Sequence, residues 1–510
     1  NTMFWPQGEG DYRMQNPYWI AYRNLRLNQK KRYMLSAQLS YDITDWLNIS
    51  GRVRVDNTHT KYEQKLYASS NLTITEESTQ GHYTISKPDE TQTYADVLAN
   101  INKRFNDFSL VANVGASIVN NRYEDLSYRG PIREKGIPNV FNVFDLDNTK
   151  KKARQDEWQE QTQSVFASVE VGWKSMLYLT LTGRNDWASQ LANSSTPCFF
   201  YPSVGLSGVI SEMLTLPEFI DYMKVRGSFS SVGMPYPRNL TSPTYEYDEA
   251  NQQWKPKTHY PIKDLKPERT NSWELGLDMR LFKDFSLGFS WYLANTFNQT
   301  FDPKVSVSSG YSKIYLQTGY VRNSGVELSL GYGHTWNNHL HWESNFTLSH
   351  NKNTIKDLVT SYIHPETGLP ITQNRLDVGG LGKARFILKK GGTLGDLYTQ
   401  SDLKRDNNGM VEIDPSGALT TEDNLPDIKL GSVFPKANLA WNNRFEWRGI
   451  SLSALFTARI GGIAYSATQA AMDQYGVSER SAQARDNGGV LLNGRTLVDA
   501  QTYYSLIGNS

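Results

Sequence analysis

The feature that most constrains how this chain folds is a set of short polar turns, each set between two stretches in which apolar and polar residues alternate. The turns are Thr44-Asp45, Asn106-Asp107, Lys174-Ser175, Lys283-Asp284, Asn337-Asn338 and Arg448-Gly449. Aromatic residues border them, namely Trp46, Phe105, Phe108, Trp173, Phe282, Phe285, Trp336 and Trp447. At the far end of each hairpin the chain enters a long polar stretch. Tight turns at one end and long loops at the other are typical of an outer-membrane β-barrel, and the rings suit a membrane–water interface.

The stretches beside the turns alternate with a period of two, which gives a strand one apolar and one polar face. The fourth turn, for example, joins an apolar series that begins at Trp273 to one that begins at Phe285. Charged residues fall on the opposite face, where they can line a wet lumen but cannot face hydrocarbon cheaply; they include Arg52, Arg54, Asp278, Arg280 and Arg459.

The length of the alternating runs distinguishes a soluble β-sandwich or propeller from a transmembrane β-barrel. A soluble β-sandwich or propeller also alternates, but its strands usually have about five or six residues. The runs here reach about ten, which is the length that a tilted strand needs to cross a bilayer. We therefore predict an all-β fold, a transmembrane antiparallel up-and-down β-barrel with long extracellular loops, with roughly 14 to 16 strands in this chain.

Composition agrees with a strand-built membrane protein. The hydrophobic content is 38% and the mean hydropathy is −0.55, and no segment approaches the ~20 continuous apolar residues of a membrane helix. A barrel needs no such segment, because only every second residue touches lipid. The net charge of +1 gives no reason to expect nucleic acid as a partner. The single cysteine, Cys198, excludes an intramolecular disulfide.

The sequence offers no group of residues that predicts catalysis, a metal or a cofactor. No Walker A loop and no G-x-S-x-G elbow occurs. His339 and His341 share a strand face beside a turn, but no cysteine or carboxylate cluster accompanies them. The stretch Asp406-Asn407-Asn408-Gly409 lacks the spacing of an EF-hand loop, so a plain turn is favoured. We predict a protein that is not an enzyme and has no catalytic residues, metal site or cofactor.

The chain follows one repeated hairpin scheme, so residues 1–510 are predicted to be part of a single β-barrel domain. The candidate surface loops are 57–92, 121–157, 186–200, 234–267, 297–320 and 352–430. The first residues have no signal-peptide pattern, and the last, Tyr503 to Ser510, do not read as a closing strand. Because an open sheet would leave backbone groups unpaired in lipid, the chain is expected to be part of a longer barrel, with material missing at both ends.

Several motifs, in their order along the chain, resemble the SusC/RagA family of TonB-dependent outer-membrane transporters of Bacteroidetes. Each one is short, but together they extend from about residue 16 to residue 462. They are Asn16-Pro17-Tyr18-Trp19, Gly183-Arg184-Asn185-Asp186-Trp187, Tyr201-Pro202-Ser203-Val204-Gly205, Met223-Lys224-Val225-Arg226-Gly227-Ser228, Leu265-Lys266-Pro267-Glu268, Trp273-Glu274-Leu275-Gly276, Asn323-Ser324-Gly325-Val326-Glu327-Leu328, Gly395-Asp396-Leu397-Tyr398, Asp427-Ile428-Lys429-Leu430-Gly431-Ser432 and Gly461-Gly462.

The resemblance implies a 22-stranded barrel in the bacterial outer membrane, crossing it many times and surrounded by its lipid. It also implies an N-terminal plug domain, a TonB box that couples to the TonB–ExbB–ExbD complex, and a SusD-like surface lipoprotein that caps the barrel. The implied function is energised import of oligosaccharides or oligopeptides. The plug, the TonB box and the closing strands are not recognisable in this sequence, so the plug is expected to lie outside it.

Two sets of residues are singled out. Aromatic residues of the 234–267 loop could stack on sugar faces and are the predicted substrate contacts; the alternative is that they pack the loop or contact the lipoprotein lid. They are Tyr245, Tyr247, Trp254 and Tyr260. The residues of the family motifs are predicted to be structural; they are Pro202, Leu265, Pro267, Glu268, Glu274, Gly325 and Glu327. Two other functions stay open: a passive outer-membrane porin and a surface β-rich glycan-binding adhesin.

Overall fold

The computed structural model describes residues 15–240, 246–248, 253–255, 259–260, 266–301, 313–314, 316–336, 339–363 and 370–509. Fifteen strands of this described part belong to one large sheet. They are β1 (Asn24–Thr44), β2 (Leu47–Tyr67), β3 (Gly81–Ser86), β4 (Asp89–Phe105), β5 (Phe108–Pro131), β6 (Lys152–Trp173), β7 (Leu177–Ala188), β8 (Cys198–Val209), β9 (Ile220–Met234), β13 (Glu268–Leu281), β14 (Phe285–Phe301), β16 (Leu316–Trp336), β17 (Leu340–Asp357), β26 (Ala437–Trp447) and β27 (Ile450–Ile460).

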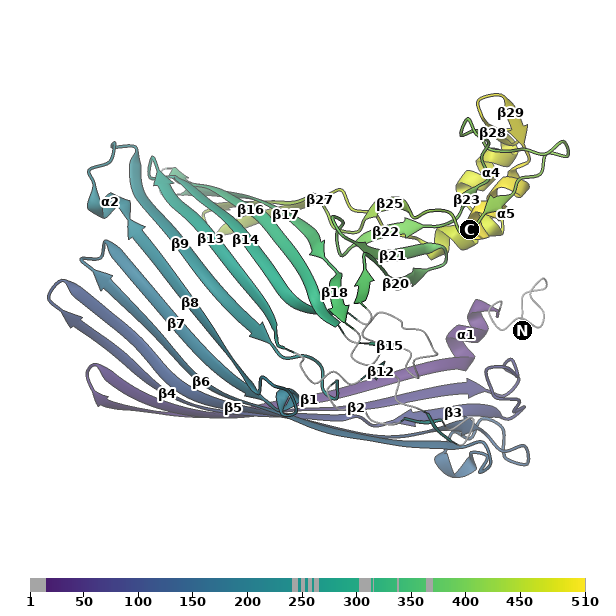
Figure 1. Cartoon of the computed structure of the whole chain (residues 1–510), viewed down its shortest axis with the longest axis horizontal. Helices are drawn as coiled ribbons and strands as arrows, with labels where there is room; N and C mark the ends of the chain where they lie inside the picture. Colours follow the sequence, from purple (N-terminus) through teal and green to yellow (C-terminus); the bar gives the residue numbers. More distant parts are fainter. Residues whose placement is uncertain are drawn as a thin grey trace. The chain divides into compact units, whose positions relative to one another are not determined.

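The chain divides into two compact units. Unit 1 comprises Asn1–Glu170, Thr182–Ala192 and Pro197–Phe200; unit 2 comprises Val171–Leu181, Asn193–Thr196 and Tyr201–Ser510. In unit 1 the strand order is β1-β2-β3-β5-β6, with β4 paired to β2 and β5. In unit 2 the order is β9-β13-β14-β16-β17-β26-β27, and Figure 1 shows β9, β13 and β14 running side by side. Neighbours are antiparallel and follow chain order, which confirms the predicted up-and-down scheme and strand number.

Tight turns join the strands where the sequence predicts them. Several turn residues have the left-handed backbone that two-residue hairpin turns require, such as Asn106 (φ 49°) and Arg448-Gly449 (φ 46° and 86°). Asn337-Asn338 lies outside the described residues. Beside the turns of unit 2, aromatic rings touch one another from strand to strand, as a girdle at a membrane interface does. The contacts are Phe219–Phe282, Phe282–Phe285, Phe285–Tyr332, Tyr332–Trp342 and Trp342–Phe445.

At the opposite end the strands run further than the sequence analysis predicted. The strands β2, β5 and β6 have 21, 24 and 22 residues, so they extend well into the segments 57–92 and 121–157 that were predicted to be loops. The loop boundaries were therefore wrong. The reason is that both faces of a strand are wet once it has left the membrane, so the apolar–polar alternation disappears although the backbone ladder continues.

Smaller elements lie outside the large sheet. A four-stranded sheet has the order β20-β21-β22-β25. Its strands are β20 (Arg375–Leu381), β21 (Ala384–Lys389), β22 (Asp396–Thr399) and β25 (Ile428–Ser432). The remaining short strands are β10 (Glu246–Asp248), β11 (Gln253–Lys255), β12 (His259–Tyr260), β15 (Lys313–Ile314), β18 (Val359–Ile363), β19 (Pro370–Gln373), β23 (Asp402–Leu403), β24 (Thr421–Glu422), β28 (Val490–Leu492) and β29 (Thr496–Val498).

The helices are α1 (Pro17–Arg23), α2 (Ile210–Met213), α3 (Ala467–Gln474), α4 (Glu479–Asp486) and α5 (Ala500–Asn509). Each helix in the described part of the chain is too short or too polar to span a bilayer. Two small apolar cores form away from the turns. One packs Val321, Ile355, Leu358 and Leu388 together, and the other packs Val411, Leu419 and Val498.

An ion-pair network joins the segment before β25 to β20 and β21. The buried Asp427 carboxylate, 4% exposed, accepts two hydrogen bonds from Arg375 at 2.7 and 2.9 Å, and Lys389 Nζ lies 2.8 Å from its Oδ2. The Arg375 hydrogen bonds, with a smaller contribution from Lys389, lower the pKa of Asp427 to about 2. The charged carboxylate therefore stabilises the fold above the unfolded pKa of about 4, and this contribution is lost as pH falls towards 2.

Asp427→Asn is expected to destabilise the four-stranded sheet by about 1–2 kcal/mol at pH 7, a figure that allows for screening of the exposed Arg375. The measurement is amide hydrogen exchange of β20 in the wild type and the variant, compared at the same pH. The variant should exchange faster at pH 7, and the two proteins should become alike near pH 2. A difference that persists unchanged at pH 2 would contradict the assignment to this carboxylate.

Candidate functional site

A cavity of about 620 Å³ lies on the polar face of the large sheet in unit 2. The strand register explains how it forms. Pairing places Arg226 (β9) beside Gly276, Ser290 beside Glu327, and Asn438 beside Arg459 (β27), with Ser349 between Glu327 and Asn438. One row of polar positions therefore crosses seven strands on a single face. The period of two along each strand creates this face, and the register aligns it from strand to strand.

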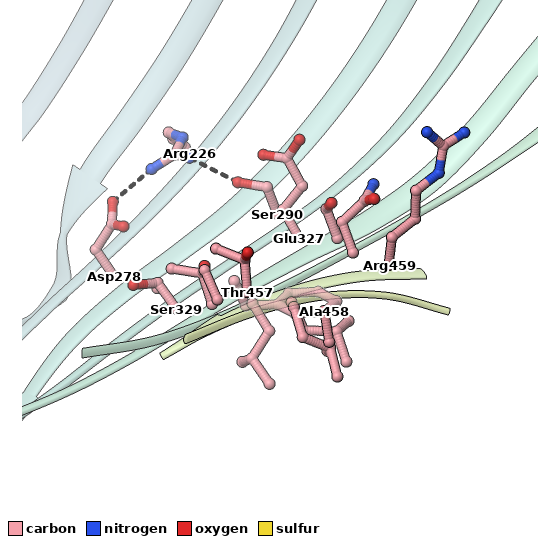
Figure 2. A pocket seen from close by; sticks show the side chains of 17 residues that line it. Arg226, Asp278, Ser290, Glu327, Ser329, Thr457, Ala458 and Arg459 are labelled. Atoms are coloured by element: carbon pink, nitrogen blue, oxygen red, sulfur yellow. Dashed lines mark hydrogen bonds and ion pairs between the residues drawn. The ribbon is translucent and has the colours of Figure 1, made fainter. Parts of the chain in front are cut away.

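Arg226 links three strands at one end of this row. Its guanidinium donates to Asp278 at 2.6 Å and to Ser290 Oγ at 2.8 Å, and Glu274 lies 3.5 Å away. The side chain crosses directly over Gly276, where a Cβ atom would lie 2.5 Å from Arg226 Nε and 2.8 Å from its Cγ. The glycine therefore makes the space through which the arginine reaches the next strands. Figure 2 shows Arg226 between Asp278 and Ser290.

Among the described residues that line the cavity, the other charged ones are Glu327 and Arg459. Within the described residues no hydrogen bond or ion pair engages the Glu327 carboxylate, and the side chain is exposed. Arg459 donates one hydrogen bond, 2.7 Å long, to the Val433 carbonyl, which leaves other N–H donors of its guanidinium. Figure 2 shows both side chains standing on the same side of the strands. Charges of both signs, with serine and threonine hydroxyls between them, give a surface that can exchange hydrogen bonds with a polar solute.

The sequence analysis predicted part of this site and missed part of it. Asp278 and Arg459 were predicted to line a wet lumen, and Glu274 and Glu327 were predicted to be structural motif residues. The structure places all four on the polar face. The role of Arg226 as the connecting residue was missed. The residues involved belong to two of the family motifs: Arg226 is in one, and Glu274 and Gly276 are in the other. The motifs alone do not show that these residues are in contact, because the contact depends on the register of β9 and β13.

The other motif residues differ in where they lie. Pro202 is within β8. Pro267 is buried before β13 and its carbonyl accepts from Asn298 at 3.2 Å, while Glu268 begins the strand. Leu265 lies outside the described residues. At Gly325 a Cβ atom would lie 2.3 Å from the His350 carbonyl oxygen and 2.5 Å from Tyr292 Oη, so the backbone and the ring together leave no room for a side chain.

Four loop aromatics, Tyr245, Tyr247, Trp254 and Tyr260, were predicted from the sequence to contact substrate. Tyr245 lies outside the described residues. Tyr247 in β10 pairs in register with Trp254 in β11, and Tyr260 belongs to β12. Their role as substrate contacts stays a prediction.

Comparison with known proteins gives consistent matches. The family model described as "TonB dependent receptor-like, beta-barrel" matches residues 3–509. The chain is 23% identical over 339 residues to TonB-dependent receptor P39 of Formosa agariphila, which covers 63% of this chain and 30% of the relative. It is 23% identical over 350 residues to TonB-dependent receptor P26 of the same organism, covering 64% and 34%. The chain thus spans about a third of the length of these relatives.

Among solved structures, the RagAB peptide transporter matches with a TM-score of 0.68 and 16% sequence identity. The match covers 87% of this chain and 49% of that one. The RagAB peptide importer in its "open-open" state matches with a TM-score of 0.67, also at 16% identity, over 88% and 48% of the two chains. At this identity the likeness concerns the fold, which agrees with the antiparallel strand order described above.

Proposed function

Because this chain belongs to the family of TonB-dependent receptor-like β-barrels, we propose that it forms barrel wall in an outer-membrane transporter that imports oligosaccharides or oligopeptides into the periplasm. The family resides in the bacterial outer membrane and consists of receptors and transporters, not of enzymes. Residues 1–510 are proposed to be part of one barrel domain of a longer protein.

The observation that carries the proposal is the polar row from Arg226 to Arg459. It lies on the face opposite apolar side chains such as Leu275, which is 57% exposed and alternates along β13 with Glu274 and Gly276, and such side chains suit contact with lipid. In a transmembrane barrel this polar face is the lumen, so a solute would move past Arg226, Glu327 and Arg459. Serine and threonine hydroxyls and charged groups of both signs can make weak and reversible contacts with a solute, which a transport route needs.

The energy source and the partners belong to the same proposal. Import is energised through TonB and the ExbB–ExbD proteins, which act on a plug domain of the intact protein, and a SusD-like surface lipoprotein closes the outer end. The RagAB matches are named as a peptide transporter and a peptide importer, which supports import of a polymer fragment in general.

The test uses the full-length protein in its native host, with the uptake of labelled oligosaccharides and oligopeptides as the readout. Uptake is expected to disappear when the gene is deleted, when TonB is removed or when a protonophore is added. Uptake that survives both TonB removal and the protonophore would favour the passive porin. Surface binding with no uptake in any strain would favour the adhesin.

The cavity itself is tested by the double substitution Arg226→Ala with Glu327→Ala. We expect uptake to fall severalfold at an unchanged level of folded protein in the outer membrane, because two charged groups of the row are lost. Arg280→Ala is the matched control, since Arg280 lies on the same face of β13 but outside the cavity. An equal loss in both variants would mean that general lumen charge, and not this cavity, is responsible.

A further inference from the structure

A second cavity lies in unit 1, and four of the nine described residues that line it are aromatic. It encloses about 820 Å³ beside the short helix α1. Tyr18, Trp19 and Tyr22 come from that helix, and Tyr67 comes from the end of β2. Among the described residues that line it, Arg23 is the one charged side chain, and none carries a carboxylate. We call this cavity the α1 pocket.

The local sequence dictates how the rings are presented. Asn16 caps α1 by accepting a hydrogen bond from Tyr18 N at 2.9 Å, and Pro17 fits the first helical position. Tyr18 and Tyr22 are then four residues apart and share one helical face. Their exposed fractions are 76% and 69%. Two large rings are thus held on one face, beside a cavity, without being packed into a core.

The remaining walls are fixed by contacts. Trp19 donates from Nε1 to Ser70 Oγ at 3.0 Å, which anchors its ring. The Arg23 guanidinium lies 5.1 Å above the centre of the Tyr67 ring, at a cation–π distance. Asn139 Oδ1 accepts from Ala68 N at 2.6 Å, and the side-chain Nδ2 of Asn139 makes no hydrogen bond to a described residue. Rigid rings and amide or guanidinium donors therefore surround one space.

The α1 pocket lies at the end of the strands away from the tight turns. α1 leads directly into β1, whose first residue Asn24 pairs with Leu66, while its last residue Thr44 is at the turn. Short turns face the periplasm and the opposite end faces outward in barrels of this kind. A solute approaching from outside the cell would meet the α1 pocket before the lumen.

We propose that the α1 pocket binds a sugar unit of an oligosaccharide, an inference that rests on the proposed import function and deepens it. The C–H faces of a pyranose ring pack against flat aromatic rings, and its hydroxyls pair with amide and guanidinium groups, both of which the pocket supplies. The volume suits a small-molecule site. A peptide would need a carboxylate partner for its amino terminus, and none of the described residues that line the pocket carries one.

The experiment measures binding by the full-length protein in detergent. The probes are maltohexaose, xylohexaose, laminarihexaose and hexagalacturonate, with a tryptic digest of casein as the peptide arm. We expect at least one hexasaccharide to bind, and Tyr18→Ala and Tyr22→Ala each to weaken it roughly tenfold, since an aromatic contact of this kind is worth about one such factor. Tyr18→Phe and Tyr22→Phe keep the ring and should bind nearly as the wild type does.

Tyr475→Ala, at a 57% exposed tyrosine of unit 2, is the matched control and should leave binding unchanged. Both α1 tyrosines are exposed, so their variants should fold, and heat-modifiable migration of the barrel verifies this. The proposal is overturned if no hexasaccharide binds, or if Tyr18→Ala and Tyr22→Ala leave the hexasaccharide affinity unchanged. It is also overturned if these variants weaken the binding of peptides instead. TonB-dependent uptake by the native host distinguishes failure of this inference from failure of the proposed import function. If uptake is observed but no hexasaccharide binds, the sugar site in the α1 pocket is wrong and the import function still stands.

Discussion

Phe289→Arg is expected to lower the free energy of unfolding by about 2–4 kcal/mol, which is the cost of an arginine on the lipid face near the middle of a bilayer. Phe289 is the fifth residue of β14 after a tight turn, so it falls near the midplane if about ten residues span the membrane. Its pairing partners Leu277 and Leu328 are apolar as well. A charge at this position would have to enter hydrocarbon or distort the bilayer.

The matched variant is Ser329→Arg on the adjacent strand β16. Ser329 pairs with Gly288, the residue before Phe289, so its side chain lies on the opposite face of the sheet, on the same side as Asp278. Its arginine would enter water near Asp278, so we expect a change within about 0.5 kcal/mol. Urea titration of the full-length protein in lipid vesicles measures both. If the two arginines cost the same, the assignment of the faces to lipid and lumen is wrong.

Gly325→Val is expected to destabilise the protein by about 3 kcal/mol or more, and to reduce the amount of assembled barrel, because overpacking against backbone cannot be relieved by a rotamer change. A Cβ atom at this position would lie 2.3 Å from the His350 carbonyl oxygen, on the paired strand β17. Separating these atoms would require the ladder between β16 and β17 to open.

The control is Gly333→Val in the same strand, where nothing lies within 4 Å of the added Cβ. It should assemble like the wild type. Adding Tyr292→Ala to Gly325→Val removes the ring contact but not the carbonyl contact, so this double variant should remain defective. Restored assembly in the double variant would show that the ring, and not the backbone, causes the defect.

The sequence predicts this fold well because its signal is local. Alternation and turn residues such as Asn106 and Arg448-Gly449 act over a few positions, and the structure has hairpins at both places. The strand ends away from the turns could not be predicted, because β5 continues to Pro131 through residues that are polar on both faces. The apolar–polar alternation ends where the strand leaves the membrane, whereas the backbone hydrogen bonds between strands continue beyond it.

The candidate site was less predictable because it depends on register. The sequence pattern of each strand predicts that Asp278 and Arg459 are on a polar face. It does not predict the six residue pairings that align Arg226 in β9 with Arg459 in β27 in one row. The α1 pocket was missed for a related reason. Its motif, Asn16-Pro17-Tyr18-Trp19, was read as a family marker before a strand, and the partner ring of Tyr67 lies far away in the sequence.

The crossing of Arg226 over Gly276 has a consequence for how this protein can diverge. Any residue larger than glycine at 276 would occupy the space of the arginine, and loss of the arginine alone would strand Asp278 without its 2.6 Å partner. The arginine is flexible and the Asp278 side chain is 40% exposed, so either single replacement can be accommodated, but each breaks the contact that joins β9 to β13. The two positions are therefore coupled, and across a large set of related sequences they should tend to change together.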